Sequence, residues 1–181
     1  MATRKILTDD DKTLTKKSRV VTDFNKRLHV LLDDMRETLI EAEGLGLAAP
    51  QVGVLRRVAL IVDIFNDSEN DDEQIIELVN PEIISSDGEQ TDTEGCLSVP
   101  DVVGIVTRPE KVTVRAFDRF GGEFTIEVSE LMARAVCHEI DHLDGVIFTS
   151  LAKRILSDEE VAELTAQREQ EAEEEEEKEE E

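Results

Sequence analysis

The sequence predicts an α+β fold, with an amphipathic helix near the N-terminus, several antiparallel strands and a second helix late in the chain. Three observations support this prediction: a helical stripe of apolar residues within positions 22–43, short segments rich in β-branched residues between positions 56 and 128, and a helical segment after Ser129. A chain of 181 residues with 39% hydrophobic content is long enough to form one sizeable core. We therefore expect one folded domain over residues 1–156 and a separate tail over residues 157–181.

The first helix is predicted from its apolar residues, which recur at intervals of three or four and so share one face. These residues are Phe24, Leu28, Leu31, Met35 and Leu39. Gly44 is expected to end the helix. It opens the stretch GLGLAAPQVG, whose three glycines give more backbone freedom than a connection between a helix and a strand needs. The stretch indicates a close approach to its backbone; a helix cap followed by a tight connection is the alternative.

Short segments rich in β-branched residues are predicted to be strands. They lie at 56–65, 75–80, 102–107, 111–118 and 123–128. The last two are joined by RFGG, where Gly121 and Gly122 are expected to supply the positive φ of a hairpin turn. The acidic segment 66–73 is predicted to be a solvated loop between strands.

The second helix is predicted to begin after Ser129, a favourable N-cap residue, and to end at Gly145. It contains HEIDH, in which His138 and His142 lie four positions apart, so both imidazoles project from one face and can bind one ion. Glu139 can reach a water at such an ion without being a ligand, which is the position of a general base in metal-assisted hydrolysis. Chance spacing is the alternative, but the chain has only three histidines.

A catalytic metal of this kind needs a third protein ligand, and no histidine follows His142. The thiolate of Cys96, in EGCLSVP, is the predicted third ligand. Cys137 is the competing candidate, but it points about 100° away from His138 around the helix and is predicted to pack in the core. A zinc metallopeptidase whose third ligand is unrelated to Cys96 is an alternative interpretation.

The composition limits where the protein acts. No apolar run approaches the ~18 residues needed to cross a bilayer, and the first ten residues lack the apolar core of a signal peptide, so we expect a cytoplasmic protein without a membrane partner.

From Ser157 to Glu181 there are 14 acidic and 2 basic residues, which account for half of the net charge of −24. This tail is expected to be helical in its first turns, to be disordered beyond them, and to be repelled by DNA.

Three stretches together resemble the pattern of the peptide deformylase family: GLGLAAPQ at 44–51, EGCLS at 94–98 and HEIDH at 138–142. The resemblance extends to RKILT, RPEKVTVRAFD and HLDGVIF, and so covers about residues 3–150. It implies an α+β fold with the metal-binding helix at its centre. It also implies removal of the formyl group from N-formylmethionine at the start of nascent polypeptides, with one Fe²⁺ that Zn²⁺, Ni²⁺ or Co²⁺ can replace.

The resemblance further implies residue roles. The side-chain amide of Gln51 and the backbone N–H of Leu97 would stabilise the oxyanion. The backbone near Leu45, Gly46 and Gly95 would pair with the extended substrate, which fits an enzyme that accepts nearly any N-terminal sequence.

Methionine selection is predicted to depend on an apolar pocket formed by Leu131, Ala135 and the edge of His138. We also expect Arg108 to pair with an acidic residue, either Glu94 or Asp141, and so to hold the cysteine loop against the second helix.

Two features depart from the family pattern. Many relatives have arginine where this chain has Val103, so peptide affinity is expected to differ. Some bacterial members dock on ribosomal RNA through a basic C-terminal helix, whereas this acidic tail would be repelled by phosphates. The ribosome is therefore a candidate partner, but the tail is not expected to be the docking element. A non-catalytic relative that acts as an acidic binding protein is the second alternative interpretation.

Overall fold

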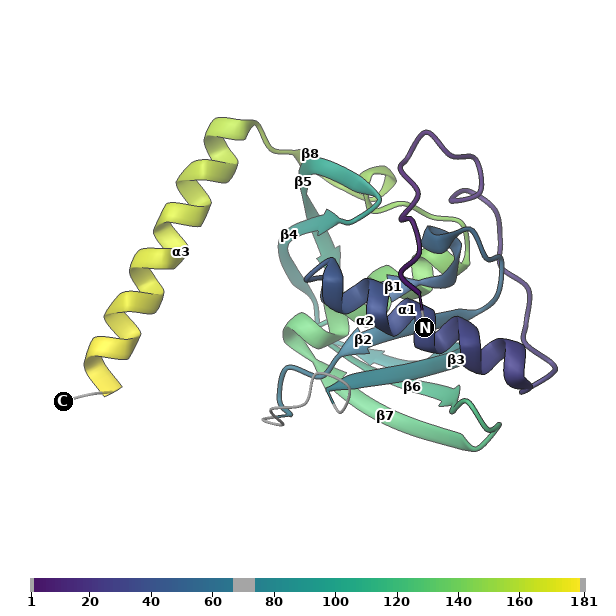
Figure 1. Cartoon of the computed structure of the whole chain (residues 1–181). Helices are drawn as coiled ribbons and strands as arrows, with labels where there is room; N and C mark the ends of the chain where they lie inside the picture. Colours follow the sequence, from purple (N-terminus) through teal and green to yellow (C-terminus); the bar gives the residue numbers. More distant parts are fainter. Residues whose placement is uncertain (1, 67–73, 180–181) are drawn as a thin grey trace.

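The structure is a computed structural model that describes residues 2–66 and 74–179. Two antiparallel sheets and two helices form the body of the molecule, and a third helix extends away from it (Figure 1). The helices are α1 (Lys26–Glu41), α2 (Glu130–Leu143) and α3 (Asp158–Glu179). In the described part of the chain, no helix is long and apolar enough to cross a membrane.

The larger sheet has the strand order β1-β2-β3-β6-β7 and the smaller sheet the order β4-β5-β8, with antiparallel neighbours throughout. The strands of the larger sheet are β1 (Gly46–Ala48), β2 (Val58–Val62), β3 (Ile75–Asp87), β6 (Lys111–Phe117) and β7 (Glu123–Ser129). Those of the smaller sheet are β4 (Gln90–Cys96), β5 (Val99–Arg108) and β8 (Arg154–Ile155). The combination of helices with antiparallel sheets confirms the predicted mixed class.

All five predicted strand segments contain a strand, although β3 continues to Asp87, beyond the predicted end at position 80. The sequence does not predict β1 or β4, because their residues are glycine-rich or polar and adopt strand conformation through pairing with β2 and β5. The segment predicted to be an acidic loop, 66–73, lies outside the described residues except for Asn66.

The hairpin turn between β6 and β7 differs in one detail from the prediction. Gly121 has a positive φ of 88°, as predicted, but Gly122 does not have a positive φ. The reason is local hydrogen bonding, because the Gly122 N–H donates to Oδ1 of Asp118 at 2.8 Å. One residue in the left-handed region is therefore enough to close this turn.

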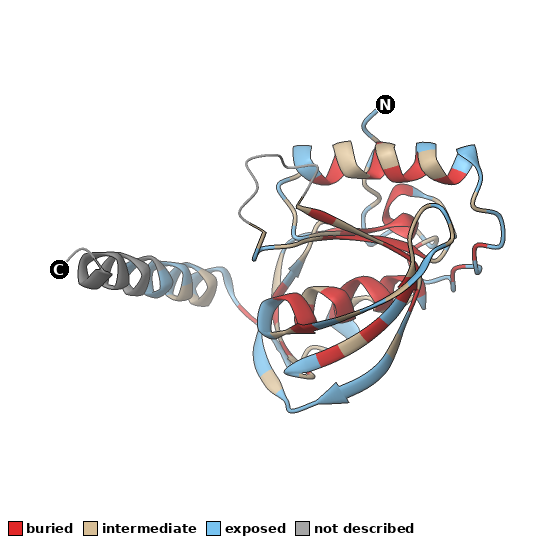
Figure 2. Ribbon diagram, turned by 90° about the horizontal axis from the view of Figure 1, so that it is seen from below, coloured by how far each residue is buried: buried red, intermediate tan, exposed pale blue. Residues whose placement is uncertain are grey.

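The two helices of the body lie on opposite faces of the larger sheet (Figure 2). Alternation along β2 explains this arrangement, since successive side chains of a strand point to opposite faces. Val58 and Leu60 pack in the cluster that contains α1, whereas Ala59 and Ile61 pack in the cluster that contains α2. A strand buried on both faces therefore fixes both helices.

The first helix begins at Lys26, four residues later than the predicted segment. Its N-cap is Asn25, whose side-chain oxygen accepts hydrogen bonds from the N–H groups of Arg27 at 2.9 Å and Leu28 at 3.4 Å. The buried face of α1 holds the predicted apolar residues from Leu28 onward: Leu28, Leu31, Met35 and Leu39. Phe24 precedes the helix and packs against Phe117, with ring centroids 5.9 Å apart.

The second helix contacts strands of both sheets. Ser129 occupies its N-cap position as predicted, but the Ser129 side chain makes no capping hydrogen bond. Cys137 is buried in the core between α2 and the larger sheet, as predicted. On the side of the smaller sheet, Phe148 packs near the ring of His138, with centroids 5.9 Å apart. These contacts place α2 between the two sheets.

The C-terminal helix begins with a capping box, in which the Glu160 N–H donates to Oγ of Ser157 at 3.3 Å and the Ser157 N–H donates to Oε2 of Glu160 at 2.8 Å. The helix then continues to Glu179, whereas the sequence predicts disorder beyond its first turns. Glutamate, alanine and glutamine are good helix formers, and no glycine or proline interrupts them. An ion pair of 2.6 Å between Arg168 and Asp92 links α3 to β4.

Candidate metal centre and active site

Three potential metal ligands converge where the end of β4 meets α2. The ligand atoms of Cys96, His138 and His142 all lie within 4.8 Å of one another. The Cys96 Sγ is 3.2 Å from Nε2 of His142, and the two imidazole rings meet edge to face with centroids 4.9 Å apart. Both histidines are buried, and Cys96 is half-buried. The structure therefore brings together the three residues that the sequence singles out as ligands.

An irregularity in β4 aims the cysteine at α2. The pairing of β4 with β5 shifts register between Glu94 and Cys96, and such a bulge turns the following side chain away from its regular direction. On α2, the separation of four positions between the histidines places both on one face, as the sequence predicts.

A carboxylate orients the first of these histidines. Oε2 of Glu94 lies 3.1 Å from Nδ1 of His138, which leaves Nε2 of the ring available as a ligand. Burial alone raises the pKa of Glu94, but hydrogen bonds from Arg108 and His138 outweigh it and lower that pKa to about 2. Glu94 is therefore an anion throughout the physiological pH range and holds the imidazole in one tautomer.

Two arginines hold this carboxylate. Arg108 donates from Nε to Oε1 of Glu94 at 2.8 Å and from Nη2 to Oε2 at 2.9 Å, and its Nη1 donates to Asp141 at 2.5 Å. It therefore pairs with both acidic residues that the sequence offers as alternatives. Arg134 also donates to Oε1 of Glu94 at 2.8 Å and to the carbonyl of Val106 at 3.1 Å. The sequence analysis does not identify Arg134, although its position four residues before His138 places it on the same helical face.

Replacing Arg108 by methionine is expected to destabilise the fold. Arg108 and Glu94 are both buried, and removing one partner of a buried ion pair costs about 3 kcal/mol because the other charge stays in a poorly solvated site. Urea unfolding followed by circular dichroism measures the loss. Arg115→Met is the matched control, since it breaks an exposed pair with Glu82 and is expected to change the midpoint little. Equal midpoints for the two variants would contradict the structural role of Arg108.

Glu139 lies beside the potential ligands with one oxygen unused. Within the described residues, its buried Oε2 has no hydrogen-bond partner. Burial raises the pKa of Glu139 to about 7. A buried carboxyl oxygen without a partner, next to a cysteine sulfur and two imidazoles, fits a site for a divalent transition metal and a water. Burial also lowers the pKa of His142 to about 3, which keeps its imidazole in the neutral form that binds metals.

Gln51 points its amide group into the same site. Its Oε1 accepts a hydrogen bond from the Ala48 N–H at 2.7 Å, so Nε2 faces the opposite way. The Nε2 group donates to Oγ of Ser98 at 3.2 Å and lies 3.6 Å from Sγ of Cys96. Gln51 is 1% exposed, so the protein fixes this donor in place before any ligand binds.

Glycines are needed in the stretch 44–53 because side chains of other residues approach its backbone closely. A Cβ at Gly44 would lie 2.8 Å from a methyl group of Leu97, and a Cβ at Gly46 would lie 2.6 Å from Oε1 of Glu139. Gly53 has a positive φ of 79° where the 3₁₀ turn Ala49–Val52 ends. Two of the three glycines thus make room for residues of the site, and the third lets the chain leave it.

Gly46→Ala is expected to reduce turnover far more than stability. The added methyl group would meet Cγ and Cδ of Glu139 as well as its oxygen, so the carboxylate must move. A displacement of about 1 Å in a reacting group can lower the rate by roughly 10²-fold. Steady-state kinetics on a substrate of the class that the family resemblance implies, and thermal unfolding of the same preparation, separate the two effects. Unchanged turnover would show that the position of Glu139 does not limit the reaction.

A cavity of about 450 Å³ opens over these residues. Ten of the eleven predicted site residues line it: Leu45, Gly46, Gln51, Gly95, Cys96, Leu97, Leu131, Ala135, His138 and Glu139. The eleventh, His142, is 1% exposed and contacts Cys96. The lining also includes residues that the sequence analysis does not assign to the site: Gly44, Thr93, Glu94, Pro100 and Arg134.

The chain resembles known proteins over most of its length. A family model described as polypeptide deformylase matches residues 3–157. A peptide deformylase of Caldicellulosiruptor bescii is 57% identical over 161 residues, which cover 89% of this chain and 92% of that one. A crystal structure of a peptide deformylase from Legionella pneumophila matches with a TM-score of 0.77 and 44% identity over 92% of both chains. A Met-ala-ser-bound class I type b peptide deformylase from Acinetobacter baumannii matches with a TM-score of 0.75 and 30% identity over 83% of this chain and 98% of that one.

Proposed function

The chain belongs to the polypeptide deformylase family, so its activity is removal of the formyl group from the N-terminal methionine of nascent peptides, and we propose that Cys96, His138 and His142 hold the metal on which this family depends. The observation that carries the proposal is the convergence of one sulfur and two imidazoles beside the unpartnered oxygen of Glu139. In this assignment α2, placed between the two sheets, is the central metal-binding helix. The amphipathic helix α1 supports the opposite face of the larger sheet.

We propose Fe²⁺ as the metal, with Zn²⁺, Ni²⁺ and Co²⁺ able to replace it. A set of one thiolate and two imidazoles suits all four ions, and their relative affinities alone would favour metals other than iron. When bound, such an ion acts as a Lewis acid that lowers the pKa of a water and polarises the formyl carbonyl. Elemental analysis of protein purified without oxygen tests this assignment. Finding zinc and no iron in such protein would contradict it.

The reaction requires a proton carrier and donors for a developing oxyanion. We propose that Glu139 takes a proton from the attacking water as the oxygen adds to the formyl carbon. The Nε2 group of Gln51 and the backbone N–H of Leu97 then donate to the oxyanion. The C–N bond breaks, Glu139 returns the proton to the departing amine, and formate and a free α-amino group result. Glu139 is placed for both transfers, because it lies beside the three proposed ligands and, within the described residues, its Oε2 has no hydrogen-bond partner.

The substrate is proposed to lie as an extended strand between the two sheets. Leu45 precedes and Gly46 begins β1, the edge of the larger sheet, while Gly95 belongs to β4, the edge of the smaller sheet. The Leu45 carbonyl accepts from the Val62 N–H at 2.9 Å, on the side of β2. Backbone groups on the open side of an edge strand can hydrogen-bond a peptide without reading its side chains. Leu131 and Ala135 line the cavity beside the edge of His138 and are the proposed apolar pocket for methionine. The tripeptide in the A. baumannii structure supports a peptide of this type as ligand.

An assay of formate release tests the proposed function directly. Iron-loaded protein kept without oxygen is expected to release formate from formyl-Met-Ala-Ser and to leave the product Met-Ala-Ser intact. Treatment with a chelator is expected to stop the release of formate. Cleavage of peptide bonds in Met-Ala-Ser would indicate a metallopeptidase. Binding without formate release would indicate the non-catalytic protein.

Nascent formylated polypeptides are the partners of this reaction, and we propose the cytoplasm as its location. The division into a catalytic domain, residues 1–156, and an acidic tail, residues 157–181, stays a prediction. Val103 does not line the cavity, so a shift in peptide affinity at this position also stays a prediction.

A further inference from the structure

The wall of the cavity that α2 forms contains a cation among apolar side chains. Leu131, Arg134, Ala135 and His138 are separated by three, one and three positions, so they share one face of α2, and all four line the cavity. Leu131 is 45% exposed, whereas Arg134 is 5% exposed, so the arginine lies deeper than the leucine. A pocket that selected methionine only by its apolar character would not need a guanidinium group at this depth.

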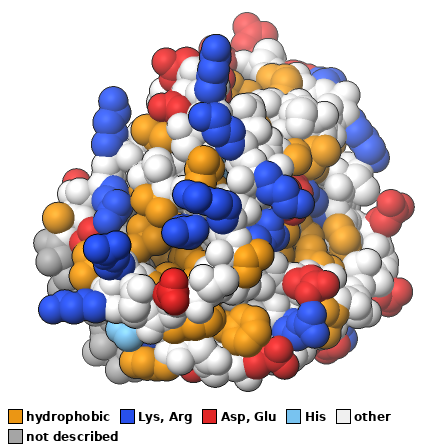
Figure 3. Space-filling model, turned by 90° about the vertical axis from the view of Figure 1, so that its right-hand side faces the viewer, with side chains coloured by type: hydrophobic (Ala, Val, Ile, Leu, Met, Phe, Trp, Pro, Cys, Tyr) orange, Lys and Arg blue, Asp and Glu red, His pale blue; other side chains and the backbone are white. Residues whose placement is uncertain are grey.

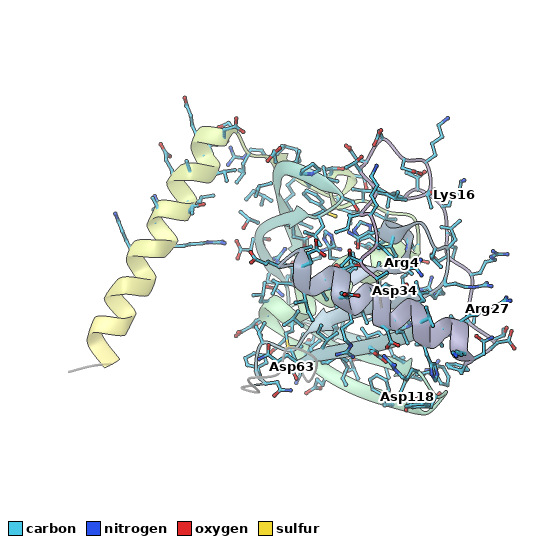
Figure 4. The ribbon with its side chains drawn as sticks, viewed as in Figure 1. Arg4, Lys16, Arg27, Asp34, Asp63 and Asp118 are labelled. Carbon is cyan, nitrogen blue, oxygen red and sulfur yellow. The ribbon has the colours of Figure 1, made fainter. Side chains whose placement is uncertain are left out.

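The burial of Arg134 distinguishes it from the cations of the surface. Figure 3 shows Lys and Arg side chains spread over one face of the molecule, and the exposed side chains of Lys16 and Arg27 project outward (Figure 4). Water hydrates such side chains, so they need no partner in the protein. The guanidinium group of Arg134 has lost most of this hydration, and its N–H groups need acceptors in the protein or in a ligand.

The protein supplies acceptors for only part of this guanidinium group. Nη1 donates to Oε1 of Glu94 at 2.8 Å and to the carbonyl of Val106 at 3.1 Å. Nη2 makes one long contact, of 3.5 Å, with the carbonyl of Gln90. Within residues 2–66 and 74–179, Nε of Arg134 has no hydrogen-bond partner, and the cavity is the open space that this side chain lines. An N–H group is therefore available to a ligand in the cavity.

The charges around Arg134 limit which ligand atoms this N–H group can accept. Glu94 also lines the cavity and lies against Arg134, while Arg108, the other cation on Glu94, is balanced by Asp141 at 2.5 Å. A carboxylate in the pocket would be repelled by Glu94, and an ammonium group would be repelled by Arg134. A neutral acceptor avoids both penalties, and the polarisable thioether sulfur of methionine is such an acceptor.

We propose that Arg134 recognises the sulfur atom of the substrate methionine by donating a hydrogen bond to it. The inference rests on the proposed function, which places the methionine side chain between Leu131 and Ala135. Norleucine has the same unbranched shape with a methylene group in place of sulfur, so the apolar walls cannot distinguish the two. Norleucine in the pocket would exclude water and leave a buried N–H group unpaired, a penalty that methionine avoids. Arg134 is then a specificity-determining residue that takes no part in proton transfer.

A comparison of methionine and norleucine substrates tests the proposal on the iron-loaded full chain kept without oxygen. The kcat/KM for formate release is expected to be roughly 3- to 10-fold higher for formyl-Met-Ala-Ser than for formyl-norleucyl-Ala-Ser. In Arg134→Met, whose side chain is unbranched and has no N–H group, this ratio is expected to fall to about 1 or below, because burial of a methylene group is itself favourable. A disturbed Glu94 would affect both substrates alike, so the ratio isolates the contact with sulfur.

Leu131→Ala is the matched control, because Leu131 lines the same pocket and has no polar side-chain atom. This variant is expected to lower kcat/KM for both substrates and to keep their ratio. Calorimetric binding of the products Met-Ala-Ser and norleucyl-Ala-Ser to the metal-loaded chain gives a readout that does not depend on turnover. It is expected to show the same preference for methionine and the same loss of preference in Arg134→Met.

Three results would overturn the proposal. They are a kcat/KM for the norleucine substrate that equals or exceeds that for the methionine substrate in the unmodified chain, an unchanged ratio in Arg134→Met, and an equal fall of the ratio in Leu131→Ala. If thermal unfolding shows that Arg134→Met does not fold, the preference of the unmodified chain decides. Absence of formate release from both substrates would contradict the proposed function instead, and the affinities of the two products would then decide the role of Arg134.

Discussion

A Glu139→Gln variant is expected to keep its fold and its metal while its turnover falls by roughly 10²- to 10⁴-fold. The amide has nearly the same shape as the carboxylate and fits the same space against Gly46, but it cannot accept a proton from the attacking water. Glu139 is not among the three residues whose ligand atoms converge, so metal content does not depend on it. Formate release and elemental analysis on the same preparation measure the two effects.

Glu130→Gln provides the matched control for this variant, because Glu130 is an exposed glutamate at the start of the same helix. It is expected to show unchanged turnover and metal content. Full activity of Glu139→Gln would contradict the role of Glu139 as proton carrier. Loss of metal from Glu139→Gln would instead show that the carboxylate is a ligand.

Hydrophobic periodicity predicts the parts of the fold that bury large apolar side chains. The helical stripe from Leu28 to Leu39 becomes the buried face of α1, and the β-branched segment around residues 58–62 becomes β2, which is covered on both faces. In both cases the local pattern is enough. A helix buried on one face repeats its apolar residues every three or four positions, and a strand buried on both faces forms a continuous apolar run. The class of the fold follows from these elements.

The strands next to the site could not be predicted in this way. β1 has the sequence GLA and β4 the sequence QTDTEGC, and neither alternates apolar with polar residues or is rich in β-branched ones. Both adopt strand conformation because β2 and β5 supply partners for their backbone groups. Each pairing joins strands that follow one another in the chain, but β1 and β4 carry no apolar pattern of their own, and the register shift between Glu94 and Cys96 leaves no mark on the sequence.

The candidate site also has contacts that the sequence predicts and contacts that it does not. The spacing of His138 and His142 and the motif around Cys96 predict the convergence that the structure shows. The contact of Glu94 with His138 and that of Arg134 with Glu94 depend on how β4 approaches α2, so they appear only in three dimensions.

Cys96→Ser is expected to lower metal affinity and turnover by more than ~10²-fold, because even groups that only orient ligands change affinity by about 10- to 100-fold. A serine hydroxyl does not ionise near neutral pH and cannot replace a thiolate. Elemental analysis after dialysis measures the loss, and Co²⁺-substituted protein gives a second readout, the near-ultraviolet absorption of a cobalt–thiolate bond.

Cys137→Ser is the matched control, since Cys137 lies one position before His138 but faces the core, where burial raises the pKa of its thiol to about 11. It is expected to retain both metal and absorption band. Full metal content in Cys96→Ser would support a metallopeptidase with another third ligand. Loss of the band in Cys137→Ser alone would make Cys137 the ligand. Because the two cysteines differ in their position relative to the face that bears His138 and His142, the pair of variants tests whether that geometry determines which sulfur binds.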